Sequence, residues 1–590
     1  MIIIFGGTTE GRIAAETLDE AGKNFFYSTK GSIQEVNCKN LVRISGGMTS
    51  EEMISFCREN NIRAIIDAAH PFAEVLHANI AIASENLSIP VIRLERIYPD
   101  LQSNVTLCAN YEDAIRKLYI NNVQTLLALT GTQTIKKLKP FWQHKKCIFR
   151  ILDREESLKI ALSEGFPKEN IRYYEGSDAE EKLINEVRPD AIITKESGLS
   201  GGFEEKVLAA NKANIQLYVV KRPKLSEKFI TVTGKHSLRR AVEQNVPDFY
   251  ELKTGLTTGS CATAATKAAM LALVNDEFVD RVSISLPNGE LVDMNIEQVE
   301  KIDDHTAQAS IIKFSGDDPD VTNGVEIIST VSFSDMEGIH FLQGKGVGTV
   351  TLPGVGLPIG SPAINKTPQE TIRNEVRSVY AGGIDVTISV TNGEEIATRT
   401  FNPKIGIVGG ISIIGTSGVV RPFSSEAFVN AIRKEVEVAK AIGSDRLVIN
   451  SGAKSERFVK AVYPDLPSQA FVHYGNFIGE TLEIAQETGF KKVTMGIMIG
   501  KAVKLAEGHL DTHSKKVVMN KDFLKQVAID SLCTEQMISH IDNMSMAREI
   551  WSSPNEDDMN RFANKILQLC KITCQQKVDN IDLTLMLIKE

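Results

Sequence analysis

Two turns rich in glycine and hydroxyl groups each precede a predicted helix, and both could bind an anion. The first is Gly6-Gly7-Thr8-Thr9-Glu10-Gly11-Arg12, and the second is Thr257-Thr258-Gly259-Ser260-Cys261. Unpaired N–H groups at a helix N-terminus carry partial positive charge and favour phosphate or carboxylate groups. The first turn lacks the Gly-x-Gly-x-x-Gly spacing, so a tight βα turn is its alternative interpretation. For the second turn, the alternative is an ordinary capped helix.

Asp67 and His70 form a third group that could take part in chemistry. They follow the apolar run Arg63-Ala-Ile-Ile and precede Pro71, a residue that suits a first helical turn. Open α/β sheets bind their ligands at the carboxyl ends of the strands. His70 therefore either faces a ligand or caps the next helix, and the residues alone leave both open.

Further polar residues follow other predicted strands. An Arg/Glu/Arg cluster ends the strand Pro90–Arg96, and the turns Thr130–Thr134 and Thr194–Gly198 each contain glycine. Three aspartates between Gly316 and Gly324 suggest a metal loop, but they lack the spacing of a calcium loop, so a solvated turn is the better interpretation. We expect no metal site.

The elements that position these residues predict an α/β protein. Short apolar runs alternate with helical patterns over residues 1–246, which predicts two Rossmann-like, doubly wound lobes, about 1–105 and 106–246, with a cleft between them. The predicted strands are 2–5, 24–28, 63–67, 90–96, 125–129, 147–151, 171–174, 191–194 and 216–220.

Residues 249–590 show a different pattern, with α+β character first and α/β character later. A hairpin is predicted around Pro287-Asn288-Gly289, with strands at 307–314 and 326–333. Residues 405–422 read as a strand with a glycine-rich loop, and residues 521–590 as helical. We expect two subdomains, 249–402 and 403–590.

Composition narrows the class of protein. The 590 residues carry a net charge of −9, which argues against a nucleic-acid partner. No apolar run approaches the ~20 residues of a membrane span. Eight scattered cysteines suggest reduced thiols and a cytoplasmic protein. The oligomeric state stays open, with a homodimer as one option.

The motifs of the first half resemble one family. Gly6–Arg12, Asp67-Ala-Ala-His-Pro-Phe-Ala73 and Lys195-Glu-Ser-Gly198 together resemble the precorrin-6A reductases, CobK/CbiJ, over nearly all of residues 1–245. The resemblance implies reduction of a ring double bond of a corrinoid by NADH or NADPH. It places the dinucleotide phosphates on Gly6, Gly7, Thr8, Thr9, Glu10, Gly11 and Arg12, and the substrate beside Asp67, His70, Lys195, Ser197 and Gly198. His70 and Lys195 could each supply the proton or bind the substrate's carboxylates.

The second half resembles another family. The run Leu252-Lys-Thr-Gly-Leu-Thr-Thr-Gly-Ser-Cys-Ala-Thr-Ala-Ala is similar to the opening of CbiD, the cobalt-precorrin-5B C1-methyltransferases of anaerobic cobalamin synthesis. The resemblance implies methyl transfer from S-adenosylmethionine to C1 of a cobalt corrinoid. It places cofactor contacts on Thr257, Thr258, Gly259, Ser260, Cys261, Gly409, Gly410 and Thr416. It makes Asp511 and His513 candidates for proton handling or for binding substrate carboxylates, with Ser514 beside the substrate.

The favoured hypothesis is therefore a bifunctional enzyme of cobalamin synthesis. The alternative is that only the methyltransferase half is active and the reductase-like half is a corrinoid-binding carrier module. That alternative arises because Ala69 stands where the reductase family has threonine.

Overall fold

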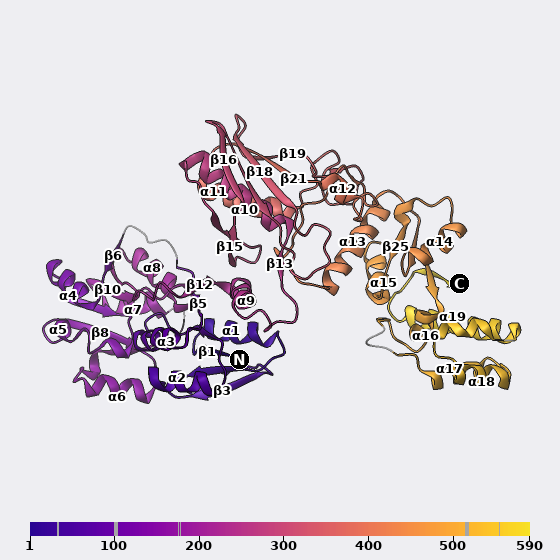
Figure 1. The fold of residues 1–590 in the computed structure, drawn as a ribbon. Coiled ribbons are helices and arrows are strands. Elements are labelled where there is room, and N and C mark those ends of the chain that lie inside the picture. Colours follow the sequence, from indigo (N-terminus) through magenta and orange to yellow (C-terminus); the bar gives the residue numbers. More distant parts are fainter. Residues whose placement is uncertain are drawn as a thin grey trace. The chain divides into compact units, whose positions relative to one another are not determined.

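The computed structural model describes residues 1–31, 35–98, 104–174, 176, 179–513, 518–553 and 555–589 of the chain. The chain forms two compact units, drawn in Figure 1. Unit 1 comprises Met1–Glu251 with the short segment Glu290–Val292, and unit 2 comprises Leu252–Gly289 and Asp293–Glu590. Both units contain helices as well as strands, which confirms the predicted α/β class.

The first sheet of unit 1 is six-stranded and parallel, in the order β12-β5-β4-β1-β2-β3. Its apolar strands are buried on both faces, as a parallel sheet covered by helices requires. From β1 the chain adds β2 and β3 on one side of the sheet, and then β4, β5 and β12 on the other side. The order in which strands are added therefore switches sides between β1 and β4, while all strands stay parallel. The elements are β1 Ile2–Phe5, α1 Thr9–Asp19, β2 Phe25–Thr29, β3 Leu41–Ser45, α2 Ser50–Glu59, β4 Ala64–Asp67, α3 Glu74–Leu87, β5 Val91–Glu95, β12 Ile230–Thr233 and α9 Gly234–Asn245.

The second sheet of unit 1 repeats this plan, in the order β6-β11-β10-β7-β8-β9 with every pair parallel. Here the order in which strands are added switches sides between β7 and β10. The elements are β6 Val105–Cys108, α4 Tyr111–Ile120, β7 Thr125–Ala128, α5 Lys139–Trp142, β8 Lys146–Ile151, α6 Glu155–Ser163, β9 Ile171–Tyr173, α7 Ala179–Val187, β10 Ala191–Lys195, α8 Phe203–Lys212 and β11 Gln216–Val220.

The predicted end of the second lobe at residue 246 is wrong. Strand β12 pairs with β5 of the first sheet, with Ile230 opposite Ile92. Helix α9 and the residues after it bury apolar side chains in the core of the first sheet, including Leu238 and Tyr250. The chain therefore returns to the first lobe after β11. A short, partly exposed strand such as β12 gives no sequence signal of which sheet it joins.

The first part of unit 2 is a five-stranded sheet, β16-β17-β18-β21-β19, that is antiparallel except for the β19–β21 pair. Helices α10 and α11 pack against each other, and α10 packs on this sheet (Figure 1). The elements are β13 Gly255–Leu256, α10 Thr258–Asn275, β14 Arg281–Ser285, β15 Leu291–Asn295, β16 Gln298–Asp303, β17 Thr306–Ile312, β18 Glu326–Phe333, β19 Ile339–Gln343, β20 Thr349–Val350, α11 Lys366–Val379, β21 Ile384–Val390, α12 Gly393–Ala397, β22 Ile407–Val408 and β23 Val419–Val420.

The second part of unit 2 is a four-stranded parallel sheet, β25-β24-β26-β27. One large core cluster lies between this sheet and its helices. The elements are α13 Ser425–Ala441, β24 Arg446–Asn450, α14 Ala453–Val462, β25 Phe471–His473, α15 Ile478–Glu487, β26 Lys492–Met498, α16 Ile499–Ala506, α17 Lys521–Asp530, α18 Glu535–Asn543, α19 Glu556–Gln575 and β27 Asp582–Ile588.

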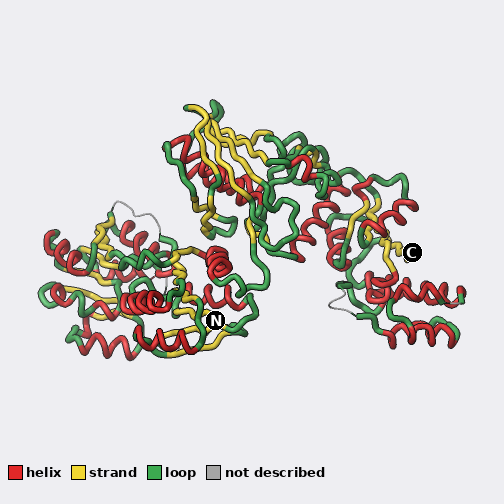
Figure 2. Tube along the Cα trace, in the orientation of Figure 1, coloured by secondary structure: helices red, strands yellow, loops and turns green. Residues whose placement is uncertain are grey.

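Two predictions for unit 2 need correction. The tail is not entirely helical, because β27 pairs in parallel with β26; Figure 2 shows this strand in yellow beside the C-terminus. Short apolar runs do not distinguish a strand from a helix by periodicity alone. Residues 405–422, predicted as a strand with a glycine-rich loop, form no continuous strand. They contain only the two-residue strands β22 and β23, with glycines at positive φ between them.

Candidate active sites

The glycine turn Gly6–Arg12 lies where the first sheet of unit 1 reverses direction. Thr8 caps α1, because its Oγ1 accepts a hydrogen bond from the Gly11 N–H at 3.0 Å. The same hydroxyl donates to the Ala68 carbonyl at 2.6 Å and so ties this turn to the turn after β4. The structure thus brings Gly6–Arg12 and Asp67–His70 together at the carboxyl ends of β1 and β4, where doubly wound sheets bind ligands.

The glycines of this turn serve different purposes. A Cβ at Gly6 would collide with the ring of Tyr27, and a Cβ at Gly11 would lie 2.6 Å from the Tyr27 hydroxyl, so packing against this buried tyrosine requires both glycines. Gly7 has a φ of +89°, and a Cβ there would meet only a Thr29 methyl group at 3.9 Å. Gly7 is therefore the glycine that faces open space. Two predicted phosphate-binding side chains of this turn are exposed: Thr9 and Arg12.

Glu10 differs from its neighbours because its carboxylate is buried at the N-terminus of α1. Ser200 donates a hydrogen bond to Oε1, and Arg96 Nε donates to Oε2 at 3.0 Å. Burial by itself raises the pKa of Glu10, but the Ser200 hydrogen bond and the Arg96 charge outweigh burial and lower this pKa. The hydrogen-bond partners of the Glu10 carboxylate are thus side chains of the protein itself.

Arg96 joins the carboxyl edges of the two sheets of unit 1. Besides its bond to Glu10, its Nη1 donates to the Ser197 carbonyl at 2.8 Å. The Ser197 hydroxyl donates to the Gly201 carbonyl at 3.2 Å. Gly198 passes so close that a Cβ there would lie 2.8 Å from the Arg96 Cβ. Ser197 and Gly198 therefore lie near the first-sheet residues, but both pack against Arg96.

Asp67 lies in a buried ionic network behind His70. Its side chain is 0% exposed and that of Arg93 is 1% exposed. Arg93 Nη1 donates to Asp67 Oδ1 and to the Ala69 carbonyl, both at 2.9 Å, and His77 Nδ1 donates to Asp67 Oδ2 at 2.8 Å. Burial alone raises the pKa of Asp67, but the His77 hydrogen bond and the Arg93 charge outweigh it and lower this pKa. His77 was not predicted as a site residue, and its only signal in the sequence is its place seven positions after His70.

His70 and Lys195 lie within electrostatic range of each other. The Phe72 N–H donates to His70 Nδ1 at 3.1 Å. Burial, followed by the charges of Lys195 and Arg96, lowers the pKa of His70 to about 3. The Lys195 ammonium lies 5.4 Å from the centre of the Phe72 ring, and burial and the Lys137 charge lower its pKa to about 8. The structure therefore groups these two predicted catalytic residues at the meeting point of the sheets.

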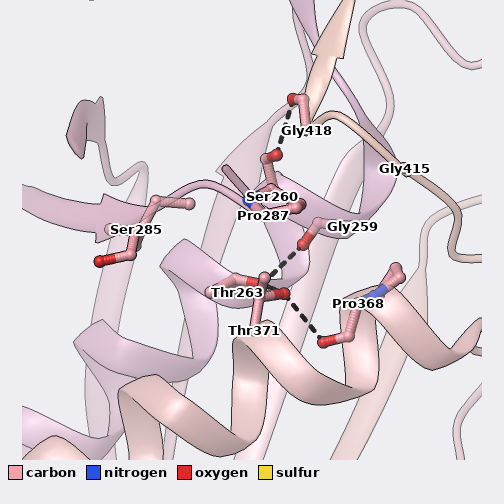
Figure 3. A pocket seen from close by; sticks show the side chains of 10 residues that line it. Gly259, Ser260, Thr263, Ser285, Pro287, Pro368, Thr371, Gly415 and Gly418 are labelled. Atoms are coloured by element: carbon pink, nitrogen blue, oxygen red, sulfur yellow. Dashed lines mark hydrogen bonds between the residues drawn. The ribbon is translucent and has the colours of Figure 1, made fainter. Parts of the chain in front are cut away.

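In unit 2, the turn Thr257–Cys261 is fastened to a segment about 155 residues away. Thr257 caps α10, and its N–H donates to the Gly418 carbonyl at 3.1 Å. The Thr258 hydroxyl accepts from the Ile414 N–H at 2.9 Å. The Ser260 hydroxyl donates to the Gly418 carbonyl at 2.7 Å (Figure 3). Thr258 is 3% exposed and Ser260 is 5% exposed. These hydroxyls thus do more than cap one helix, since they join two distant segments.

A pocket lies beside this junction. It is small and open to solvent, and its polar lining is mostly hydroxyl groups and backbone from α10, α11 and the loops facing them (Figure 3). Its lining residues are Gly259, Ser260, Thr263, Ile284, Ser285, Pro287, Pro368, Thr371, Gly415 and Gly418.

The predicted second cofactor loop of unit 2 is divided between two places. Gly415 packs against Thr257 so closely that a Cβ would collide with it, and Thr416 is exposed next to it. Gly410 instead packs against Gly346, whose carbonyl accepts a hydrogen bond from the Ile411 N–H at 3.0 Å. The structure therefore brings Thr416, but not Gly409 and Gly410, to the Thr257–Cys261 turn.

Asp511 and His513 follow α16 in the second part of unit 2. Asp511 forms a β-bridge with Phe477, and its Oδ1 accepts from the His513 N–H at 3.1 Å. Beside them Lys501 Nζ donates to Asn476 Oδ1 at 2.8 Å, and burial and the Lys504 charge lower the pKa of Lys501 to about 8. The sequence analysis gave Lys501 no role. The predicted Ser514 contact lies outside the described residues.

The aspartates between Gly316 and Gly324 each have a separate partner. Asp317 accepts from the Lys253 N–H at 2.7 Å, Asp318 from the Phe423 N–H at 3.1 Å, and Asp320 pairs with Lys313 at 2.7 Å. Over the residues that the structure describes, no group of three or more His, Cys, Asp or Glu side chains is arranged for a metal ion. Within those same residues, no helix is both long and apolar enough to span a membrane.

Comparison with known proteins identifies the second half of the chain. A cobalt-precorrin-5B C(1)-methyltransferase of Prosthecochloris aestuarii is 40% identical over 336 residues, which cover 55% of this chain and 91% of that protein. The protein of the same description from Geobacillus sp. (strain WCH70) is 40% identical over 332 residues, with the same coverage. The CbiD family model matches residues 245–422. The chain belongs to the CbiD family.

Residues 1–243 match a second family model, precorrin-6x reductase CbiJ/CobK. The predicted fusion of a CbiJ/CobK domain with a CbiD domain is therefore confirmed. Among solved structures, a CobK precorrin-6A reductase is 19% identical with a TM-score of 0.35, and covers 41% of this chain and 96% of its own. The cobalamin biosynthesis protein cbiD from Archaeoglobus fulgidus is 30% identical with a TM-score of 0.25, and covers 45% and 83%. Scores this low add nothing to the fold, which rests on the strand orders given above.

Proposed function

We propose that this chain is a bifunctional enzyme of anaerobic cobalamin synthesis that works in the cytoplasm. Unit 2 would transfer a methyl group from S-adenosylmethionine to C1 of cobalt-precorrin-5B, and unit 1 would reduce the resulting precorrin-6A macrocycle with a reduced nicotinamide dinucleotide. The observation that carries the proposal is the pairing of the two family domains in one chain. The product of the methyl transfer is the substrate of the reduction, which gives the fusion a chemical reason.

The turn after β1 fits a dinucleotide phosphate. Gly7 faces open space, and among the described residues the Thr9 N–H has no acceptor. Backbone N–H groups at a helix N-terminus bind phosphate well. When bound, the nicotinamide supplies a hydride to the substrate. The residues of unit 1 would hold the dinucleotide at Gly7 and Thr9, with Glu10 neutralised by Arg96 so that it does not repel the phosphates.

The hollow beside Thr257–Ser260 is where we place one end of S-adenosylmethionine. Its free space of about 10 Å³ holds about one water molecule, so it would receive at most a small polar group of the cofactor. Hydroxyl groups of Ser260, Thr263 and Thr371 provide polar contacts there. The sulfonium supplies an activated methyl group, so the protein needs only to orient the reactants and exclude water. Asp511 and His513 stay candidates for the substrate carboxylates.

The structure offers nothing that favours the carrier alternative. Ala69 raised that alternative, yet Ala69 builds its turn through its backbone: its N–H donates to Asp67 Oδ1 at 3.2 Å and its carbonyl accepts from Arg93. The turn therefore forms without a threonine hydroxyl at this position.

Replacing Gly7 with alanine tests the dinucleotide site. The added methyl group would point into the space where we place the phosphates, and the positive φ would cost about 1–2 kcal/mol of stability. We expect affinity for the reduced dinucleotide to fall at least about tenfold, equivalent to about 1.4 kcal/mol, in calorimetry. S-adenosylmethionine binding by the same polypeptide is the control and should not change. Unaltered dinucleotide affinity would refute the assignment of this turn.

The end of β2 favours NADPH as the dinucleotide. In Rossmann-type folds an acidic residue about 20 positions after the glycine turn binds the ribose of NAD, whereas a basic residue accommodates the 2′-phosphate of NADP. Here Lys30 follows β2, no acidic residue occurs between Tyr27 and Gly31, and the exposed Arg43 lies on the neighbouring strand β3. The 2′-phosphate would therefore meet two cations.

Reversing these two charges should lower the preference for NADPH. We expect Lys30→Glu with Arg43→Glu to weaken NADPH binding at least about tenfold while NADH affinity changes little, because a 2′-phosphate would face two carboxylates. The control is Lys168→Glu with Lys182→Glu, an equal charge change at exposed positions of the second lobe. An equal loss of affinity for NADH and NADPH would show that these residues do not recognise the 2′-phosphate.

A further inference from the structure

The meeting point of the two sheets in unit 1 holds two groups that the sequence could not rank as proton donors. His70 follows β4 of the first sheet, and Lys195 ends β10 of the second sheet. Both lie beside Phe72: the His70 ring centre is 6.0 Å from the Phe72 ring centre, and the Lys195 ammonium is 5.4 Å from it. Their hydrogen bonds and charged neighbours distinguish the two groups.

His70 is fixed in one tautomer by the backbone. The Phe72 N–H donates to Nδ1, so that nitrogen must carry a lone pair, and the proton of the neutral ring sits on Nε2. A second proton on the ring is disfavoured, because burial and three cations, Lys195, Arg96 and Arg93, oppose it and only Glu10 favours it. His70 therefore offers an N–H hydrogen bond at Nε2 and lacks the acidic second proton of an imidazolium near neutral pH.

A buried network holds the His70 backbone in place. His77 Nδ1 donates to Asp67, and its Nε2 lies 3.1 Å from the His70 carbonyl oxygen. Arg93 completes the network by bonding both Asp67 and the Ala69 carbonyl. These contacts are buried and bond the backbone of the turn that carries His70, so they position His70 without contacting a ligand themselves.

Lys195 lies in a different environment. In the described part of the chain its ammonium makes no hydrogen bond or ion pair and lies against the Phe72 ring. Its charged neighbours are mostly cations: Lys137, which pairs with Glu74 at 3.7 Å, and Lys206, which donates to the Gly201 carbonyl. From the first lobe it lies near His70, which also has Arg96 and Glu10 as charged neighbours. The adjacent Glu196 pairs with Arg222. Burial and Lys137 together lower the pKa of Lys195 to about 8, close to the value that suits a general acid near neutral pH.

We propose that Lys195 donates the proton in the reduction and that His70 is a neutral hydrogen-bond donor, positioned by Asp67, His77 and Arg93. The proposal rests on the proposed reductase function. One carbon of the substrate double bond accepts a hydride ion from the reduced nicotinamide. The hydride carries two electrons and one proton, so the nicotinamide is oxidised. The second carbon uses the π-electron pair to take a proton from Lys195 Nζ. Lys195 is left as a neutral amine and regains its proton from water.

The first test does not depend on turnover. In the full chain labelled with ¹⁵N-histidine, with His70→Asn used for assignment, we expect the His70 signal to keep the Nε2–H tautomer between about pH 5 and pH 9. With ¹⁵N-lysine, and Lys195→Arg for assignment, we expect the Lys195 ammonium to titrate near pH 8. A His70 signal that titrates near its ordinary pKa, or that shows the Nδ1–H tautomer, would overturn the proposal.

The second test compares reduction rates. Lys195→Arg keeps the positive charge but cannot give up a proton. We expect its maximal rate to fall at least about a hundredfold, with substrate and dinucleotide affinities nearly unchanged. His70→Gln keeps an N–H donor and should lose less than about tenfold. The wild-type rate should fall as pH rises above about 8, because the acid must be protonated.

A control separates Lys195 from Lys206, the other lysine of this region, whose pKa burial and Arg150 lower to about 8. Lys206→Arg should keep the fall in rate above about pH 8, and dinucleotide affinity reports the folding of unit 1 in every variant. A Lys195→Arg chain that reduces at the wild-type rate, or a fall above pH 8 that disappears with Lys206→Arg, would overturn the proton assignment alone. A wild-type chain that methylates but reduces nothing would instead overturn the proposed reductase function, and this proposal with it.

Discussion

Replacing Arg93 with methionine should lower the free energy of unfolding of unit 1 by about 3–5 kcal/mol, the cost of leaving a buried carboxylate without its cation. Arg93 is 1% exposed, and it neutralises Asp67, which is 0% exposed. Methionine keeps the apolar part of the side chain, so the loss measures the ionic contact more than packing. Denaturant unfolding followed by circular dichroism, with methylation reporting unit 2, gives the value.

The matched control is Arg63→Met, which breaks an arginine–aspartate pair of similar length, 2.7 Å, at an exposed place. Exposed ion pairs contribute about 0–1 kcal/mol, so this variant should unfold almost like the wild type. The difference between Arg93→Met and wild type should also shrink as pH falls. Asp67 has a lowered pKa in the folded chain, so its ionic stabilisation is present at neutral pH and lost as acid protonates it. Equal small losses for both variants would contradict the buried network.

Replacing Thr258 and Ser260 together with alanine should have the largest effect in unit 2. The change leaves the Ile414 N–H without its acceptor, at about 1–3 kcal/mol for an unsatisfied group. It also removes one of two donors from the Gly418 carbonyl, which keeps the Thr257 N–H. The turn and the segment around Gly418, which both line the pocket, are then no longer held together by these hydrogen bonds. We therefore expect methylation to fall at least about tenfold, or about 1.4 kcal/mol of transition-state stabilisation.

Reduction by the same polypeptide shows whether unit 1 is intact in this variant. Thr398→Ala removes an exposed hydroxyl that bonds only locally to the Glu395 carbonyl, and it should change neither stability nor methylation. Methylation is measured well below the midpoint temperature of unfolding, where the double variant is folded. A loss of rate under these conditions reflects a binding defect and not unfolding. If the folded double variant methylates at the wild-type rate, the turn is only a structural joint, and the methyltransferase site lies elsewhere in unit 2.

Local patterns were enough to predict most of the strand–turn–helix units and the turns that carry candidate residues. Ile2–Phe5 followed by glycines and a capping threonine fixes a strand, a turn and a helix start within a dozen residues. Pairings between distant segments gave no such signal. Strand β12 joins the first sheet across more than a hundred residues, and nothing in Ile230–Thr233 indicates its partner.

The candidate sites show the same limit. The sequence pointed to Asp67, His70 and Lys195, but not to the His77 and Arg93 contacts that determine what each of them can do. It pointed to Thr258 and Ser260 as donors to a ligand, although both hydroxyls bond the segment around Ile414 and Gly418. Side-chain partners of this kind depend on three-dimensional packing, which residue types and spacing do not specify.

One measurement tests the central claim most directly, that unit 2 methylates the macrocycle which unit 1 then reduces. The full chain is incubated without oxygen with cobalt-precorrin-5B, S-adenosylmethionine labelled in its methyl group, and NADPH deuterated at the transferred position, and the products are followed by mass spectrometry. The account predicts a first product with one labelled methyl group, and then a second that has also gained one deuterium and one solvent hydrogen. It predicts no NADPH consumption when S-adenosylmethionine is omitted. Methylation that never leads to reduction, or reduction of the unmethylated macrocycle, would contradict it.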